Sequence, residues 1–322
     1  MRDKQLKIVL FLLSLPSGSI LLLKAYGVSQ MYHSLYYLFL PSVLLFFLAL
    51  VLAYRKSKEV YHLAIIGALG GLIGTFGYDL ARVPFMLMGS RIFVPINMYG
   101  IWLSDASNAS AFTDSLGWVY HFSNGITFGI LYALFMKGKS FWWAIGYALL
   151  LETIFVVSPF GELFGLASKP LSLAAAYLGH VAYGYPLGKM VQNYDATLKS
   201  LRYFKKGLVT GTGLIALATL VLCLFFYRNK EVITEITFND KSISPSIIRL
   251  EYGGQITLNN QMTSPEKQSI LIGDAETELL PNERKSVDIT APGIFQVKVK
   301  NNQKLKSIFV LSEPVEQFNQ AN

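Results

Sequence analysis

Seven apolar stretches, each near the length needed to cross a bilayer, occupy the first 227 of the 322 residues. A membrane-spanning helix needs about 20 mostly apolar residues to cross ~30 Å of hydrocarbon. In lipid the backbone of such a segment satisfies its hydrogen bonds only as a helix or a closed barrel. The pattern therefore predicts a multi-pass helical bundle with spans at Ile8–Leu23, Ser34–Ala53, Val60–Ala81, Gly117–Met136, Phe141–Phe160, Leu171–Val191 and Gly207–Tyr227.

The charge distribution predicts a topology rather than a nucleic-acid partner. The net charge is +8, but residues 1–227 hold 17 Lys/Arg against 8 Asp/Glu, whereas residues 228–322 hold 11 against 12. Alternate connections between the predicted spans carry 13 cations, and the other short connections carry 3. Cations favour the cytoplasmic side of a membrane. We therefore expect a protein of the cell membrane with its N-terminus inside and residues 228–322 outside.

The sequence changes its period after the last apolar stretch and predicts a second, all-β domain over residues 228–322. Short segments there alternate apolar and polar residues or favour β-branched ones, with Gly-Gly and Pro-Gly turns between them. Such a series of short strands is typical of a two-sheet sandwich. We expect strands near Val232–Phe238, Ser246–Tyr252, Gln255–Leu258, Gln268–Ile272, Ser286–Thr290, Gly293–Val299 and Ser307–Leu311.

Three parts of this domain resemble a known family. The run from Phe238 through Ser244–Ile248 to Gly253–Leu258 is similar to the opening of a cupredoxin domain. Ala291–Phe295 is similar to the turn and strand that precede the copper-binding loop of that family. The resemblance covers roughly residues 232–312 and implies a cupredoxin-like fold.

The copper ligands implied by that family are missing. The family's copper sites use two histidines, a cysteine and usually a methionine, but residues 228–322 contain no His, no Cys and only Met262. Gln268 stands where the first histidine is expected, and Val297–Leu305 replaces the ligand loop. A trigonal His₂Cys copper site therefore cannot form here. We expect this domain to be a cap over the membrane site or a docking surface for a partner protein.

Two histidines within the apolar stretches are each followed by a glycine four residues later and another eight residues later. Glycines four residues apart allow close helix packing in lipid, so the spacing is partly a packing device. Two short matches of this kind are weak evidence of internal duplication. The two sets are His121, Gly125, Gly129 and His180, Gly184, Gly188.

Ionisable side chains within spans are costly and mark candidate functional sites. Asp79 and Arg82 lie near the outer end of the third span, on one helix face. Counting ~1.5 Å per residue puts Glu152 about 12 Å and His180 about 14 Å below the outer boundary, with His121 several ångströms shallower. Glu152 and His180 are therefore the pair best matched in depth.

Three chemical interpretations of this set remain open. His121, Glu152 and His180 could ligate a transition metal, with Asp79 as a fourth ligand or a supporting partner. The two histidines could instead be the axial ligands of a haem. Asp79, Arg82, Glu152 and His180 could line a path for protons or a polar solute. Alternatively, Asp79 pairs with Arg82 and Glu152 with His180 only to fix helix packing.

These interpretations give three function classes. The leading one is a membrane protein with an outer-half polar site that binds a metal or haem and serves metal handling or an oxidoreductase system. The second is a proton-linked or polar-solute transporter. The third is an accessory subunit that docks a larger complex through its β-domain. The long outer connection Met88–Leu116 mixes aromatic and acidic residues, and we expect it to lie on the membrane surface or to fold over the pocket.

Overall fold

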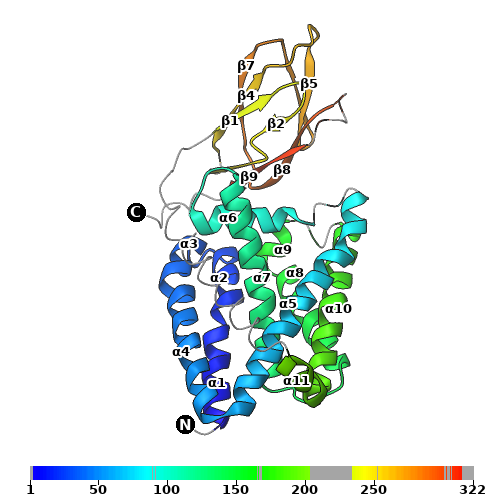
Figure 1. The fold of residues 1–322 in the computed structure, drawn as a ribbon. Helices are drawn as coiled ribbons and strands as arrows, with labels where there is room; N and C mark the ends of the chain where they lie inside the picture. The colour runs from blue at the N-terminus through cyan, green and yellow to red at the C-terminus, as the bar shows by residue number, and fades with distance from the viewer. Residues whose placement is uncertain are drawn as a thin grey trace. The chain divides into compact units, whose positions relative to one another are not determined.

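The computed structural model describes two compact units (Figure 1). The first combines Met1–Ile96 with Trp118–Phe226, and the second combines Asn97–Gly117 with Tyr227–Asn322. Within these bounds the described residues are 3–203 and 234–313, except 89, 91, 165, 167, 168, 252, 301, 303, 304 and 306. The predicted seventh span, Gly207–Tyr227, lies outside the described residues.

Helices dominate the first unit, and several begin at a residue that explains the start. Pro16 begins one helix and Pro159 another, since a proline has no N–H to leave unsatisfied there. Ser57 caps the longest helix, because its hydroxyl accepts a hydrogen bond from the backbone N–H of Val60 at 3.4 Å. The helical elements are α1 (Asp3–Ser14), α2 (Pro16–Ala25), α3 (Met31–Ser34), η1 (a π-helix, Leu35–Phe39), α4 (Leu40–Lys56), α5 (Lys58–Leu87), α6 (Val94–Ser104), α7 (Ala111–Ala133), α8 (Trp142–Val157), α9 (Pro159–Leu163), α10 (Pro170–Gln192) and α11 (Tyr194–Tyr203).

The structure does not support seven spans. Within the described residues, three helical stretches are long and apolar enough to cross a membrane: Asp3–Ala25, Met31–Lys56 and Lys58–Leu87. The fifth predicted span is α8, whose 16 residues extend only about 24 Å. The fourth and sixth are α7 and α10, which are 23 residues long but carry many polar side chains. The structure therefore supports the coarser statement, a helical region with three candidate membrane-spanning stretches among the described residues.

Glycines set how closely α5 approaches α7. A Cβ atom on Gly67 would lie 2.6 Å from the carbonyl oxygen of Gly129, and one on Gly71 would lie 2.2 Å from that of Gly125. Atoms cannot approach that closely, so each contact requires glycine. Gly125 and Gly129, singled out by their spacing, thus lie at the α5–α7 contact.

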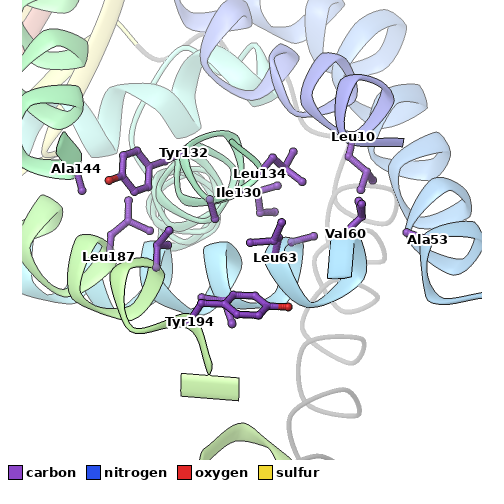
Figure 2. Packing of buried hydrophobic residues seen from close by; sticks show 14 of the residues in the cluster. Leu10, Ala53, Val60, Leu63, Ile130, Tyr132, Leu134, Ala144, Leu187 and Tyr194 are labelled. Carbon is purple, nitrogen blue, oxygen red and sulfur yellow. The ribbon is translucent and has the colours of Figure 1, made fainter. Parts of the chain in front are cut away.

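The other two glycines singled out by spacing lie at a different contact, between α10 and α8. A Cβ atom on Gly184 would lie 2.8 Å from the carbonyl oxygen of Ala144, and one on Gly188 would lie 2.7 Å from that of Phe141. The two glycine sets therefore bring different helix pairs together. Apolar side chains from α1, α4, α5, α7, α8, α10 and α11 form one buried cluster, part of which Figure 2 shows around Leu63, Ile130 and Leu187.

Strands of the second unit form two sheets. One has the order β2-β1-β4-β7 and the other β3-β9-β8-β5-β6. Ile236, Ile256, Ile270 and Val310 are among the apolar residues buried in this unit. The strands are β1 (Glu235–Phe238), β2 (Ile243–Ser244), β3 (Ile247–Glu251), β4 (Gln255–Asn260), β5 (Gln268–Ile272), β6 (Ala275–Leu279), β7 (Arg284–Asp288), β8 (Gly293–Val299) and β9 (Ile308–Glu313).

The sequence predicted strands at seven of these places and missed β2 and β6. Both missed strands lie at the edge of a sheet. Most of β6 is exposed and its sequence, AETEL, is largely polar, so it lacks the apolar alternation by which a strand is recognised. The predicted strand at Ser286–Thr290 lies two residues late, because β7 begins at Arg284.

Part of the long outer connection belongs to the second unit. The backbone N–H of Arg249 donates to the carbonyl oxygen of Ser107 at 2.7 Å, and the N–H of Ala109 donates to that of Ile247 at 2.9 Å. An isolated antiparallel bridge also joins Asn108 to Ile248. The segment 107–109 thus lies along β3, joined to it by two backbone hydrogen bonds and one isolated bridge. The domain boundary predicted at residue 227 assigned this segment to the helical domain, whereas the structure groups it with the sheets.

Candidate functional site

The carboxylate of Asp79, on α5, contacts two side chains. One of its oxygens is 3.1 Å from Nη2 of Arg82, one turn later on the same helix. The same carboxylate contacts His121 of α7, whose Nε2 lies 3.0 Å from one carboxylate oxygen and 3.1 Å from the other. The carboxylate therefore joins a guanidinium and an imidazole. His121, which appeared too shallow for Glu152 and His180, pairs with Asp79 instead.

Glu152 of α8 and His180 of α10 form a second pair. Nδ1 of His180 lies 3.2 Å from Oε2 of Glu152 and 3.0 Å from the carbonyl oxygen of Ala176. The carbonyl oxygen of Ala176 can only accept, so it favours a hydrogen on Nδ1. The Glu152 side chain is 7% exposed. The two residues thus lie together and away from the surface of the helical unit.

Tyr78 lies between the two pairs, and no pattern in the sequence pointed to it. The centroid of its ring is 4.8 Å from that of His180 and 5.7 Å from that of His121. Its hydroxyl accepts a hydrogen bond from Nη1 of Arg82 at 2.7 Å. A tyrosine within an apolar helix is ordinary, so only the arrangement of the helices reveals this position.

A small residue on α10 makes room for this arrangement. A Cβ atom on Gly179 would lie 2.7 Å from the Tyr78 ring and 3.2 Å from Cδ of Arg82. The guanidinium of Arg82 lies over two rings, 4.0 Å from the centroid of Tyr78 and 4.7 Å from that of Phe93. Its Nε is buried and has no hydrogen-bond partner in the described part of the chain. The cation is thus held by one carboxylate, one hydroxyl and two aromatic faces.

The candidate ligands do not form a metal cluster. Across the described residues, no group of three or more His, Cys, Asp or Glu side chains is arranged to hold a metal ion. Asp79 and His121 form one pair, and Glu152 and His180 form another. The set therefore does not fit a four-ligand metal centre. A haem fits no better, because the ring of Tyr78 contacts both imidazoles where a porphyrin would have to lie.

A buried ionic cluster in the second unit was not foreseen from the sequence. Arg249 of β3 places Nη1 3.0 Å from Asp105 and Nε 3.2 Å from Glu313 of β9. The indole N–H of Trp102, on α6, donates to the other oxygen of Glu313. Burial by itself lowers the pKa of the Arg249 guanidinium, and the carboxylates of Glu313 and Asp105 together raise it above its ordinary value. The cluster ties α6 and its following turn to β3 and β9.

Gln268, at the position of the first expected copper ligand, begins β5. Its Nε2 donates to the carbonyl oxygen of Glu266 at 3.1 Å. Residues 228–322 hold no His and no Cys, so nothing in them can replace the ligands of a His₂Cys site.

Comparison with known proteins gives weak structural neighbours only. No model of a known protein family matches the chain, and no curated protein does. Among solved structures, the Cu-containing nitrite reductase from Thermus scotoductus SA-01 has 12% identity and a TM-score of 0.23, over 26% of this chain and 23% of that one. An oxidised amicyanin mutant has 12% identity and a TM-score of 0.22, over 27% of this chain and 87% of that one. A reduced Cu(I) form of another amicyanin mutant at pH 4 has 11% identity with the same TM-score and coverage.

These neighbours are cupredoxins, and the C-terminal region of this chain is a β-sheet domain of two sheets. A TM-score near 0.2 does not establish a shared fold. The description of the domain therefore rests on its own strand order, and its function is not inferred from the neighbours.

Proposed function

We propose that the protein is a multi-pass membrane protein that takes up and releases a proton at Glu152–His180, as part of the proton-linked transport of a polar solute. The observation that carries the proposal is the contact between this carboxylate and this imidazole inside the helical unit, 3.2 Å apart. The proposal keeps the topology expected from the cations, with the N-terminus inside and the β-domain outside.

The charge balance of the site supports a proton as the bound species. Asp79 and Arg82 neutralise each other at 3.1 Å. The carboxylate of Glu152 then leaves a net formal charge of −1 on the three side chains Asp79, Arg82 and Glu152. One proton, on Glu152 or on the adjacent imidazole, brings the site to zero. Because an unbalanced charge within a membrane costs several kcal/mol, the neutral form is favoured there and a proton binds.

The arrangement also favours proton transport over metal handling. A metal needs three or more converging ligands, and the four candidate ligands within the described residues divide into two pairs. A carboxylate within a membrane needs only one proton to become neutral, and no further ligand.

A pH jump on a solid-supported membrane tests this without a known solute. Proteoliposomes that contain the wild-type protein should give a transient current when the external pH is changed, because a proton binds within the membrane. Glu152→Gln should reduce this current at least tenfold, because the amide cannot bind the proton. Glu162→Gln is the matched control, since Glu162 is exposed on α9, and it should retain the wild-type current.

Three results would overturn the proposal. The first is a wild-type current no larger than that of protein-free liposomes. The second is an equal current from Glu152→Gln, purified with the same elution volume and melting curve as the wild type. The third is one transition-metal ion per chain in the wild type that is lost in His180→Gln but kept in His33→Gln, which would indicate metal handling.

A further inference from the structure

The connection between α7 and α8 is held closely against the end of α10. The backbone N–H of Gly138 donates to the carbonyl oxygen of Val191 at 3.1 Å. The N–H of Phe141 donates to Oε1 of Gln192 at 3.0 Å. The start of α8 and the end of α10 therefore form one defined corner of the helical unit.

Two lysines lie at this corner. The ammonium of Lys189 is 4.3 Å from the ring centroid of Phe141 and 5.8 Å from that of Tyr185. Lys139 is exposed in the connection itself. Within the described part of the chain, neither ammonium has a carboxylate at salt-bridge distance, whereas Lys137 nearby is 3.5 Å from Glu59. Lys139 and Lys189 are thus available to an external anion.

Two large indole rings are exposed beside these cations. Trp142 is 66% exposed and Trp143 is 61% exposed, both in the first turn of α8. Further along the same helix Leu150, Ile154 and Val157 are also exposed. Tryptophan is enriched at the level of lipid headgroups, and exposed aliphatic residues face acyl chains. The exposed side chains of α8 therefore change from indole rings at its start, next to the two lysines, to aliphatic chains further along, as a phospholipid changes from headgroup to chain.

We propose that this corner binds one anionic phospholipid, with the phosphate at Lys139 and Lys189 and an acyl chain along α8. The proposal rests on the membrane placement of the helical unit, but not on its proton chemistry. The corner lies at the end of the unit that the cation distribution assigns to the cytoplasm, where anionic lipids are concentrated. A lysine near such a surface contributes roughly a fivefold preference, so the two together should enrich anionic over zwitterionic lipid by about 25-fold.

Tryptophan quenching by brominated lipids tests the proposal directly. The full-length protein is reconstituted into phosphatidylcholine vesicles with a small fraction of brominated phosphatidylglycerol or, in parallel, the same fraction of brominated phosphatidylcholine. The wild type should be quenched more strongly by the brominated anionic lipid. Lys139→Gln/Lys189→Gln should remove the difference, and Lys267→Gln/Lys285→Gln in the second unit should keep it. Trp142→Phe/Trp143→Phe should also remove the difference, because it removes the reporting rings.

Equal quenching of the wild type by the two lipids would overturn the proposal. So would a difference that survives in the Lys139/Lys189 or the Trp142/Trp143 double variant. Inorganic phosphate added to the vesicles should leave the difference unchanged, since the site takes a lipid, and competition by free phosphate would contradict that assignment. The pH-jump current of the Lys139/Lys189 variant should stay at the wild-type level, so failure here is distinguishable from failure of the proton site.

Discussion

At the scale of single residues, the sequence predicted which side chains to examine but not how they combine. Counting residues from span ends matched Glu152 with His180 in depth, and the structure holds them 3.2 Å apart. The same counting set His121 apart as too shallow, and Asp79 was matched with Arg82 on its own helix, so the contact between His121 and Asp79 was missed. Tyr78 gave no signal, since its position between the two imidazoles depends on the missing side chain of Gly179. What the pairs do chemically stays a prediction.

Removing one oxygen from Tyr78 tests its place beside Arg82. Tyr78→Phe keeps the ring between the histidines but removes the acceptor of the 2.7 Å hydrogen bond from Nη1 of Arg82. A buried donor left without its partner costs about 1–3 kcal/mol. We expect the free energy of unfolding in detergent to fall by that amount. Tyr37→Phe, at a residue that is 83% exposed, should leave it unchanged, and equal stability of the two variants would refute the assigned role of Tyr78.

At the scale of elements, glycine spacing predicted close helix packing, but not which helices meet. Gly67 and Gly71 face α7, whereas Gly74, on the same helix, lies against Tyr183 of α10. The spacing of glycines along the sequence does not tell which of two neighbouring helices each glycine on α5 contacts. Strands were easier to predict than helix contacts, because the period-two alternation of a half-buried strand can be recognised within one short segment. The polar edge strand β6 escaped, since its residues are mostly exposed.

A single methyl group on α5 should destabilise the helical unit. In Gly71→Ala the new Cβ atom would meet the carbonyl oxygen of Gly125 at 2.2 Å, and a backbone atom cannot rotate away. Overpacking of this kind costs about 1–3 kcal/mol. Gly146→Ala on α8 is the control, because a Cβ atom there meets nothing within 4 Å. That variant should be neutral or up to about 1 kcal/mol more stable. Thermal unfolding in detergent measures both, and a Gly71→Ala protein as stable as Gly146→Ala would contradict the observed packing.

At the scale of the whole molecule, the order of helical and β regions was predictable, but the number of spans and the limits of the units were not. The helices α7 and α10 were predicted as spans, but they combine sufficient length with many polar residues and are not among the three candidate spans of the described residues. The second unit is discontinuous in sequence, since it includes Asn97–Gly117. The residues that join this segment to the sheets, Arg249 and Glu313 among them, are charged residues that sequence patterns place on a surface.

Arg249 should therefore be essential to the second unit of the full-length protein. Arg249→Met leaves the buried carboxylate of Glu313 without its cation, and breaking a buried ion pair on one side costs about 3–5 kcal/mol. Arg284→Met removes an exposed pair with Glu235, which contributes at most about 1 kcal/mol. Hydrogen exchange should show faster opening of β3, β9 and residues 107–109 in Arg249→Met alone. Equal exchange in the two variants would mean that this ionic cluster does not hold the segment in place.

The central claim is that a proton binds at Glu152–His180, and a pH-difference infrared spectrum measures this most directly. The spectrum is recorded between two pH values for the wild type, for Glu152→Gln and for Glu162→Gln, each reconstituted in lipid. Subtracting the Glu152→Gln spectrum from that of the wild type should leave carboxyl or imidazole bands that report a single proton. The same subtraction with Glu162→Gln in place of the wild type should leave the same bands. A subtraction that leaves no pH-dependent band would contradict the account.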